Sequence, residues 1–129
     1  MKNIIISVEN ISLQAQLNDS STTQKIYSAL PFQGYANTWG DEIYFEIPVT
    51  LEKEPDARAD VEIGTLGYWP VGKAFCIFFG PTPVSTDKNP RAASPVNIFG
   101  NVISDATQLR SVQSGAKVRV ERDESKEVG

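Results

Sequence analysis

The chain is divided into short runs in which apolar and polar residues alternate, and Gly, Pro, Asn or Asp separates most of these runs. Alternation of this kind covers residues 4–8, 11–17, 43–47 and 117–121. Because successive side chains of a strand point to opposite faces of a sheet, each run predicts a strand with one buried face. Many short strands joined by tight turns indicate an antiparallel, mainly β protein.

Residues 74–79 are continuously apolar, which is typical of a strand covered on both faces. On such a strand Phe75, Ile77 and Phe79 share one face, and Cys76 and Phe78 share the other. We expect this strand to belong to the core. Cys76 has no basic neighbour in the sequence, so we expect a buried, unreactive thiol.

Two segments carry helix signals. Ser21 can cap a helix, Gln24 can return a hydrogen bond to the cap, and Pro31 stops the helix. Ser104 or Asp105 can cap a second, shorter helix that ends near Gly115. The segments 50–59 and 85–94 are polar and contain Pro, and we expect exposed loops there.

About eight short strands and two short helices predict a closed antiparallel β-barrel, because closure removes the exposed edges that many strands create. A two-sheet sandwich is the alternative. With 129 residues the chain has the size of one domain, residues 1–129. Residues 122–129 form a charged tail that we expect to fray.

The sequence contains no histidine and one cysteine. The absence of histidine excludes Ser-His-Asp and Cys-His nucleophile pairs and histidine zinc sites. A single cysteine excludes a disulfide within the chain. We expect no metal and no cofactor, and any chemistry must come from carboxylates, Lys, Arg, Tyr or the backbone.

The net charge is −4, and the basic residues are scattered along the chain. A nucleic-acid partner is disfavoured, because such a surface needs clustered Lys and Arg. The apolar run 4–6 is too short for a signal peptide or a membrane span. We therefore expect a cytoplasmic protein with no membrane partner, whereas the oligomeric state stays open.

Three segments resemble a prokaryotic family of small cyclophilin-like proteins of unknown function: Trp39–Phe45, Gly67–Pro83 and Ala93–Ile98. The resemblance spans nearly the whole chain. It implies a cyclophilin-type barrel of about eight strands with two helices, in agreement with the pattern of runs. Cyclophilins use a strand Arg beside an apolar pocket to speed rotation about X-Pro bonds, but the similar stretch here carries Tyr68 and Trp69 instead, so their activity is not implied.

Tyr68 and Trp69 are the first candidate site residues, because they precede Pro70 and Gly72, where a strand would leave the barrel. Aromatic rings at that point can line a groove for an apolar or proline-like ligand. Alternatively, both rings plug the barrel end. The phenol needs a polar partner, which favours the groove for Tyr68 and the plug for Trp69.

Polar candidates follow in the loops. Thr82, Ser94 and Asn97 can orient a ligand by hydrogen bonds, although ordinary turn chemistry explains them as well. Arg91 can reach over the groove to hold a carboxylate or an amide, although a solvated loop charge is the commoner role. Asp41 and Glu42 fit a hairpin turn better than an acid–base pair.

These patterns favour a binding module whose groove around Tyr68, Trp69, Phe79 and Thr82 holds a small molecule or a peptide segment. Two alternatives remain. One is a peptidyl-prolyl isomerase in which Arg91 replaces the strand arginine. The other is a structural subunit, such as that of a homo-oligomer, that uses an uncovered barrel face.

Overall fold

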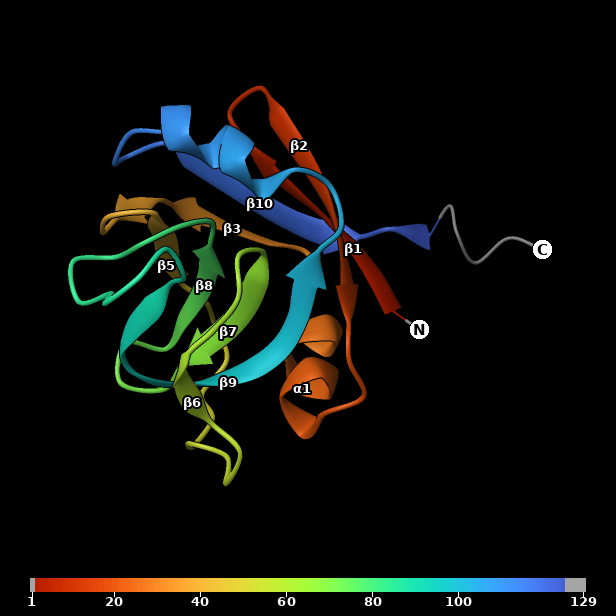
Figure 1. Ribbon diagram of the computed structural model, residues 1–129. Coiled ribbons are helices and arrows are strands. Elements are labelled where there is room, and N and C mark those ends of the chain that lie inside the picture. Colours follow the sequence, from red (N-terminus) through yellow and green to blue (C-terminus); the bar gives the residue numbers. More distant parts are fainter. Residues whose placement is uncertain (1, 125–129) are drawn as a thin grey trace.

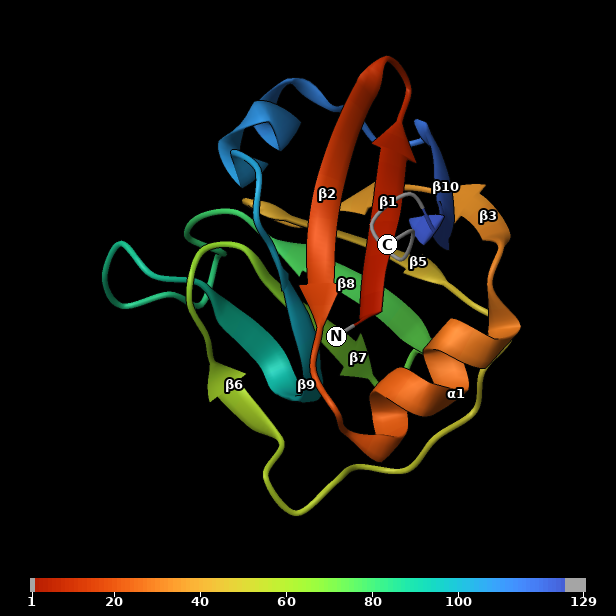
Figure 2. The same cartoon turned by 90° about the vertical axis from the view of Figure 1, so that its right-hand side faces the viewer.

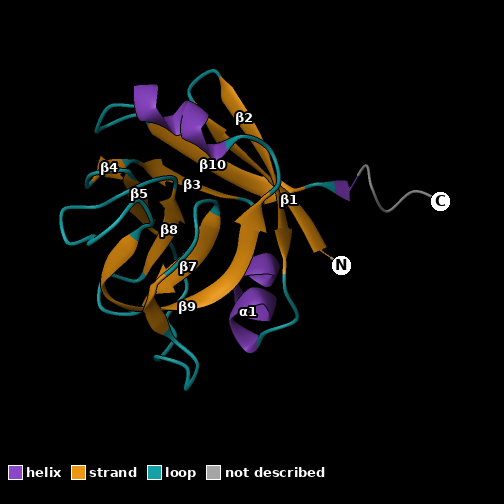
Figure 3. Ribbon diagram, in the orientation of Figure 1, coloured by secondary structure: helices purple, strands orange, loops and turns teal. Residues whose placement is uncertain are grey.

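The computed structural model describes residues 2–124, which form one strongly curved antiparallel sheet with two short helices (Figures 1 and 3). The mainly β prediction with two short helices is confirmed. The elements, in chain order, are β1 (Lys2–Val8), β2 (Ile11–Leu17), α1 (Ser21–Ala29), β3 (Phe32–Tyr35), β4 (Asn37–Thr38), β5 (Glu42–Glu46), β6 (Arg58–Asp60), β7 (Thr65–Trp69), β8 (Ala74–Phe78), β9 (Arg91–Val102), the 3-10 helix η1 (Ala106–Ser111) and β10 (Lys117–Arg122).

The sheet differs from the predicted closed barrel of about eight strands. In the described residues it has ten strands, in the order β3-β10-β1-β2-β9-β7-β8-β5-β4, with β6 paired to β9 outside this path. The two ends, β3 and β4, are consecutive in the chain, so the sheet curls back on itself (Figure 2). The two ends meet only through the chain at Ala36, whose backbone bonds to Gly115 and Ala116 before β10.

The interior of the curved sheet holds the main core. Phe75 lies at its centre, stacked against Phe45 at 5.2 Å between ring centroids and edge-on to Phe99 at 5.0 Å. Phe32 closes the group from β3, 6.2 Å from Phe75. Because the four rings come from four strands, their contacts link distant parts of the curved sheet.

The outer face of β7, β8 and β9 carries a second, smaller group, which we call the outer cluster. Its members come from several strands: Val61, Ala74, Cys76, Phe78, Ala92 and Val96. The division of residues 74–79 between two faces is therefore confirmed, with Phe75, Ile77 and Phe79 in the main core. The start of β9 and the short β6 cover this face of the sheet (Figure 1).

The long strand β9 begins earlier than the sequence predicts. The loop predicted over 85–94 ends at Pro90, and Arg91 and Ser94 belong to the strand. Arg91 lies opposite Asp60 of β6, and the pairing with β6 extends β9 toward its N-terminal end. Strand β9 passes close to β2 at Gly100, where a Cβ would collide with the carbonyl oxygen of Gln16.

The helices lie near opposite ends of the curved sheet (Figures 1 and 2). Helix α1 is capped one residue earlier than expected: the hydroxyl of Ser20, not Ser21, accepts from the backbone N–H of Thr23. Ser21 is free to donate to the Glu54 carboxylate instead, at 2.6 Å. Asp105 caps η1, as the sequence predicts. No helix within residues 2–124 is long and apolar enough to cross a membrane.

The start of the expected tail is ordered. Arg122 is the last residue of β10, and its guanidinium lies over the Tyr27 ring and donates to the Tyr27 carbonyl. Asp123 is buried, and its N–H donates to the carbonyl of Asn3. The sheet therefore includes Arg122, and Asp123 is bound at the edge of β1, whereas residues 125–129 of the expected tail lie outside the described residues.

Candidate functional site

A small apolar cavity of about 200 Å³ opens on the outer face of the sheet. We call it the aromatic pocket, and seven residues line it: Trp39, Glu42, Tyr44, Trp69, Ala92, Ala93 and Val96. Glu42 and Tyr44 alternate with the core residues Ile43 and Phe45, so both face outward from β5. Strands β5, β7 and β9 thus contribute walls to one recess.

Trp69 holds a fixed position in this pocket. Its indole N–H donates to the Ser94 hydroxyl at 2.6 Å, and its ring meets Tyr44 edge-on at 6.2 Å. A Cβ at Gly72 would lie 2.7 Å from the indole ring, so only glycine allows the turn to pass beneath it. The structure brings together two predicted site residues, Trp69 and Ser94, and it places the half-buried Trp69 in a pocket wall rather than as a plug.

Glu42 is the buried carboxyl of the pocket, with 6% of the residue exposed. Desolvation raises the pKa of Glu42 to about 7, and a hydrogen bond with the Cys76 side chain opposes part of that shift. Burial and the neighbouring Glu42 raise the pKa of the Cys76 thiol well above its usual value, which agrees with the expected unreactive thiol. Among the described residues, no Lys or Arg forms an ion pair with Glu42.

Sequence reasoning missed Trp39, Glu42 and Tyr44. The residues around Gly40 do form the expected turn, in which the Trp39 N–H donates to the Glu42 carbonyl. Asp41 behaves as a turn residue should and pairs with Arg110 at 3.6 Å. The available signal was the period of two in β5, which puts Glu42 on the same face as Tyr44 and therefore beside an aromatic ring.

Tyr68 does not line the pocket, because its ring is completely buried in the main core. It points to the opposite face of β7 from Trp69. The hydroxyl of Tyr68 finds both of its hydrogen-bond partners within the protein: it donates to the Val49 carbonyl at 2.6 Å and accepts from the Leu51 N–H at 3.1 Å. The structure therefore places Tyr68 away from the aromatic pocket, where it fastens the segment after β5 to the core.

Replacing Tyr68 by phenylalanine tests this fastening role. The substitution leaves the buried Val49 carbonyl and the half-buried Leu51 N–H without their partner, so we expect a loss of about 1–3 kcal/mol in the free energy of unfolding. Urea unfolding followed by circular dichroism measures it. The matched change Tyr35→Phe removes an exposed hydroxyl and should leave stability unchanged; equal losses in both variants would refute the role.

Asn97 and Phe79 are also structural. The fully buried Asn97 side chain accepts from the Glu54 N–H at 2.8 Å and donates to the Glu52 carbonyl and the Thr22 hydroxyl. It therefore ties the loop after β5 to β9 and α1. Phe79 is buried in the main core. Neither residue is among those that line the aromatic pocket.

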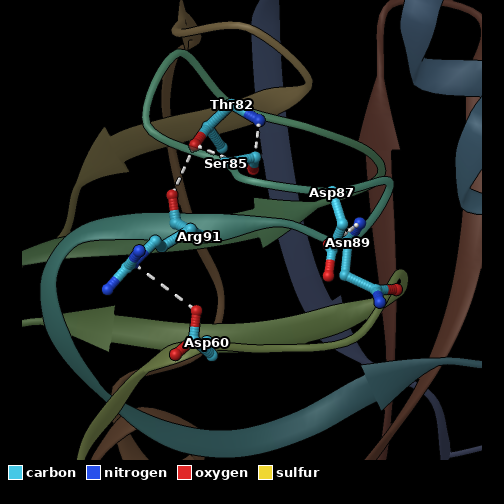
Figure 4. A network of polar contacts seen from close by, with 6 residues as sticks. All are labelled: Asp60, Thr82, Ser85, Asp87, Asn89 and Arg91. Carbon is cyan, nitrogen blue, oxygen red and sulfur yellow. Dashed lines mark hydrogen bonds and ion pairs between the residues drawn. The ribbon is translucent and has the colours of Figure 1, made fainter.

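Thr82 and Arg91 meet at a second place, between the loop 80–90 and the start of β9 (Figure 4). The Thr82 hydroxyl donates to the Arg91 carbonyl, and its N–H donates to Ser85. The Arg91 guanidinium pairs with Asp60 at 3.5 Å and lines a separate recess of about 280 Å³. Arg91 is therefore not among the residues that line the aromatic pocket.

A wider recess of about 410 Å³ lies between β2, β6 and β9. Its lining is more polar than that of the aromatic pocket, and it includes the exposed polar residues Asn18, Arg58, Glu62 and Asn101. A ligand bound there would displace water from polar groups that are already hydrated, so little apolar surface would be buried. The aromatic pocket is the better candidate because its walls are mainly apolar and its one carboxyl is buried. Residues 2–124 contain no group of carboxylate and thiol side chains arranged to hold a metal ion.

Comparisons with known proteins agree with this architecture. The family model described as cyclophilin-like matches residues 2–121. The solution structure of the hypothetical protein AF2241 from Archaeoglobus fulgidus is similar, with a TM-score of 0.80, 40% sequence identity, and 95% of each chain covered. No curated protein matches the sequence. The match over nearly the full length shows that the chain belongs to the cyclophilin-like family.

Proposed function

We propose that this protein is a binding module whose aromatic pocket holds an apolar part of a small molecule or of a peptide segment. The observation that carries the proposal is the pocket itself, in which Trp39, Tyr44 and Trp69 surround one buried carboxyl. Aromatic rings supply large contact areas at a small entropic cost, and a single polar group can orient the ligand.

The arrangement of neighbouring side chains supports binding over catalysis. Cys76 is buried and its thiol is held in the protonated form, which makes it a poor nucleophile. Arg91, the residue on which an isomerase site would depend, is paired with Asp60 at a different recess. What remains at the aromatic pocket is a shaped apolar surface with Glu42 as its one carboxyl.

Both tryptophans of the chain line this pocket, which makes the proposal easy to test. A library of small aliphatic, aromatic and amine fragments is screened by nitrogen–proton correlation spectra. We expect binders to shift the indole N–H signals of Trp39 and Trp69 together with the backbone signals of Ala92 and Ala93. Shifts scattered over the surface, or confined to the recess beside Arg91, would contradict the proposal.

A variant whose pocket is filled by a larger side chain tests the same proposal. Ala93 is exposed and lines the pocket, so Ala93→Leu should fill the space without disturbing the core and weaken fragment binding by ~10-fold or more. Ser28→Leu adds the same bulk on the exposed side of α1 and should leave binding unchanged. A protease-coupled assay on X-Pro peptides accompanies the titrations, and catalysed rotation there would favour the isomerase instead.

A further inference from the structure

We infer that the group recognised in the aromatic pocket is a methylated ammonium cation, and this inference rests on the binding function proposed above. The three lining rings of Trp39, Tyr44 and Trp69 and the Glu42 carboxyl are the features that select it. Each feature attracts positive charge for a different physical reason, and the pocket offers nothing that repels it.

The rings act through their quadrupoles. An aromatic face is electron-rich, so a cation held against Trp or Tyr within about 6 Å of the ring centre is attracted, with Trp the strongest. Trp69 and Tyr44 stand edge-to-face at 81°, an arrangement that gives the pocket two walls at nearly right angles. Trp39 adds a third ring. Two indoles and a phenol around one small space form the kind of cage that suits a quaternary ammonium group.

The carboxyl supplies the counter-charge. Glu42 is buried and has no Lys or Arg partner among the described residues, although Arg110 binds its neighbour Asp41 and Arg91 precedes the lining residue Ala92. Arg110 is held by Asp41, and Arg91 is held by Asp60. The seven lining residues themselves include no basic side chain. A cation brought by a ligand would therefore meet an unneutralised carboxylate in a poorly hydrated space.

The hydrogen-bonding capacity of the pocket favours a methylated over a simple ammonium group. A primary ammonium carries three N–H donors, each of which needs an acceptor when it leaves water. The side-chain acceptors in the lining are the Glu42 carboxyl and the Tyr44 hydroxyl, and the nearby Ser94 hydroxyl already accepts from Trp69. Methyl groups remove this demand and pack against Ala92, Ala93 and Val96.

The size of the cavity limits the ligand. About 200 Å³ is less than the roughly 300–1,000 Å³ of cavities that enclose drug-sized molecules. The pocket can therefore enclose a head group while the rest of the ligand stays outside. A trimethylammonium group on a free small molecule and the same group on a trimethylated lysine share this chemistry, so the experiment includes both.

Titration of the intact protein with matched probes tests the inference, with tryptophan fluorescence and the indole N–H signals as readouts. The probes are tetramethylammonium, choline, a peptide containing trimethyllysine, and 3,3-dimethyl-1-butanol, which has the shape of choline without its charge. We expect choline to bind ~10-fold or more tightly than the neutral alcohol. Comparing choline with the peptide identifies the source of the head group.

Glu42→Gln supplies the charge control, because it keeps the shape of the carboxyl and removes its charge. We expect ~10-fold weaker binding of choline and an unchanged affinity for the neutral alcohol, whereas Glu46→Gln, an exposed site on the same strand, should change neither. Cation binding should also strengthen from about pH 5 to about pH 8 as Glu42 ionises. The other ionisable groups beside Glu42 are Cys76 on β8 and Tyr44 on β5; β7 and β9 contribute none to the lining.

Two results would overturn the inference, and they are distinguishable from failure of the proposed function. Equal affinity for choline and the neutral alcohol in the unmodified protein would refute cation recognition while the pocket still binds. Cation binding that survives Glu42→Gln undiminished would refute the role of the carboxyl. If the probes and the whole fragment library leave both indole signals unmoved, the binding function itself is wrong.

Discussion

Raising the pH from about 5 to about 8 should destabilise the folded protein by up to about 3 kcal/mol through Glu42 alone. The pKa of Glu42 is raised from 4.5 to about 7, so the folded chain binds this proton more tightly than the unfolded chain does. This contribution is fully present below pH 4.5 and is lost as the pH rises through 7. Urea unfolding at a series of pH values measures it.

Glu42→Gln separates this effect from the other carboxylates of the chain. The variant resembles the protonated acid at every pH, so it should match the unmodified protein near pH 4.5 and exceed its stability at pH 8. Glu46→Gln should follow the unmodified protein throughout, because Glu46 is exposed on the same strand. A constant difference between Glu42→Gln and the unmodified protein across this pH range would show that the buried carboxyl is not the titrating group.

Phe75→Ala should cost about 3–5 kcal/mol of unfolding free energy, a large part of the roughly 5–15 kcal/mol available to a small domain. The ring of Phe75 contacts those of Phe32, Phe45 and Phe99, and its removal leaves a cavity bordered by four strands. Urea unfolding followed by circular dichroism and by tryptophan fluorescence gives the loss.

Two further variants keep this second prediction testable if Phe75→Ala does not fold. Phe75→Leu fills part of the cavity and should lose clearly less stability than the alanine variant would. Tyr35→Ala removes an aromatic ring that is 68% exposed and should stay within about 0.5 kcal/mol of the unmodified protein. A loss at Phe75→Leu no larger than that at Tyr35→Ala would show that this cluster does not hold the sheet together.

The sequence predicts the β architecture well because periodicity is a local property. The alternation over residues 4–8 and 11–17 gives β1 and β2, and the apolar run 74–79 gives the two-faced strand β8. Strand order and closure depend instead on which distant segments share hydrogen bonds. The sequence around Ala36 does not reveal that its backbone forms hydrogen bonds with Gly115 and Ala116, the residues before β10.

The site was predicted less completely, for a similar reason. Trp69 and Ser94 were both identified, but their contact depends on the antiparallel pairing of β9 with β7. The positions of Tyr68 and Trp69 were interchanged, because neighbouring residues on a strand face opposite ways and the sequence does not say which face is inside. Glu42 was assigned to the turn, since its burial depends on Cys76 of β8 and on the start of β9, both of which are distant in the sequence.

The short strands at the two ends of the sheet restrict how this protein can bind other polypeptide chains. Strands β3 and β4 have four and two residues, so they present few unpaired backbone groups at either end of the path. β-Augmentation, in which a partner adds a strand to an edge, needs a longer row of such groups. A peptide partner is therefore expected to be selected by one side chain inserted into the pocket and not by its main-chain conformation. Such selection tolerates wide variation in the sequence that flanks the inserted side chain.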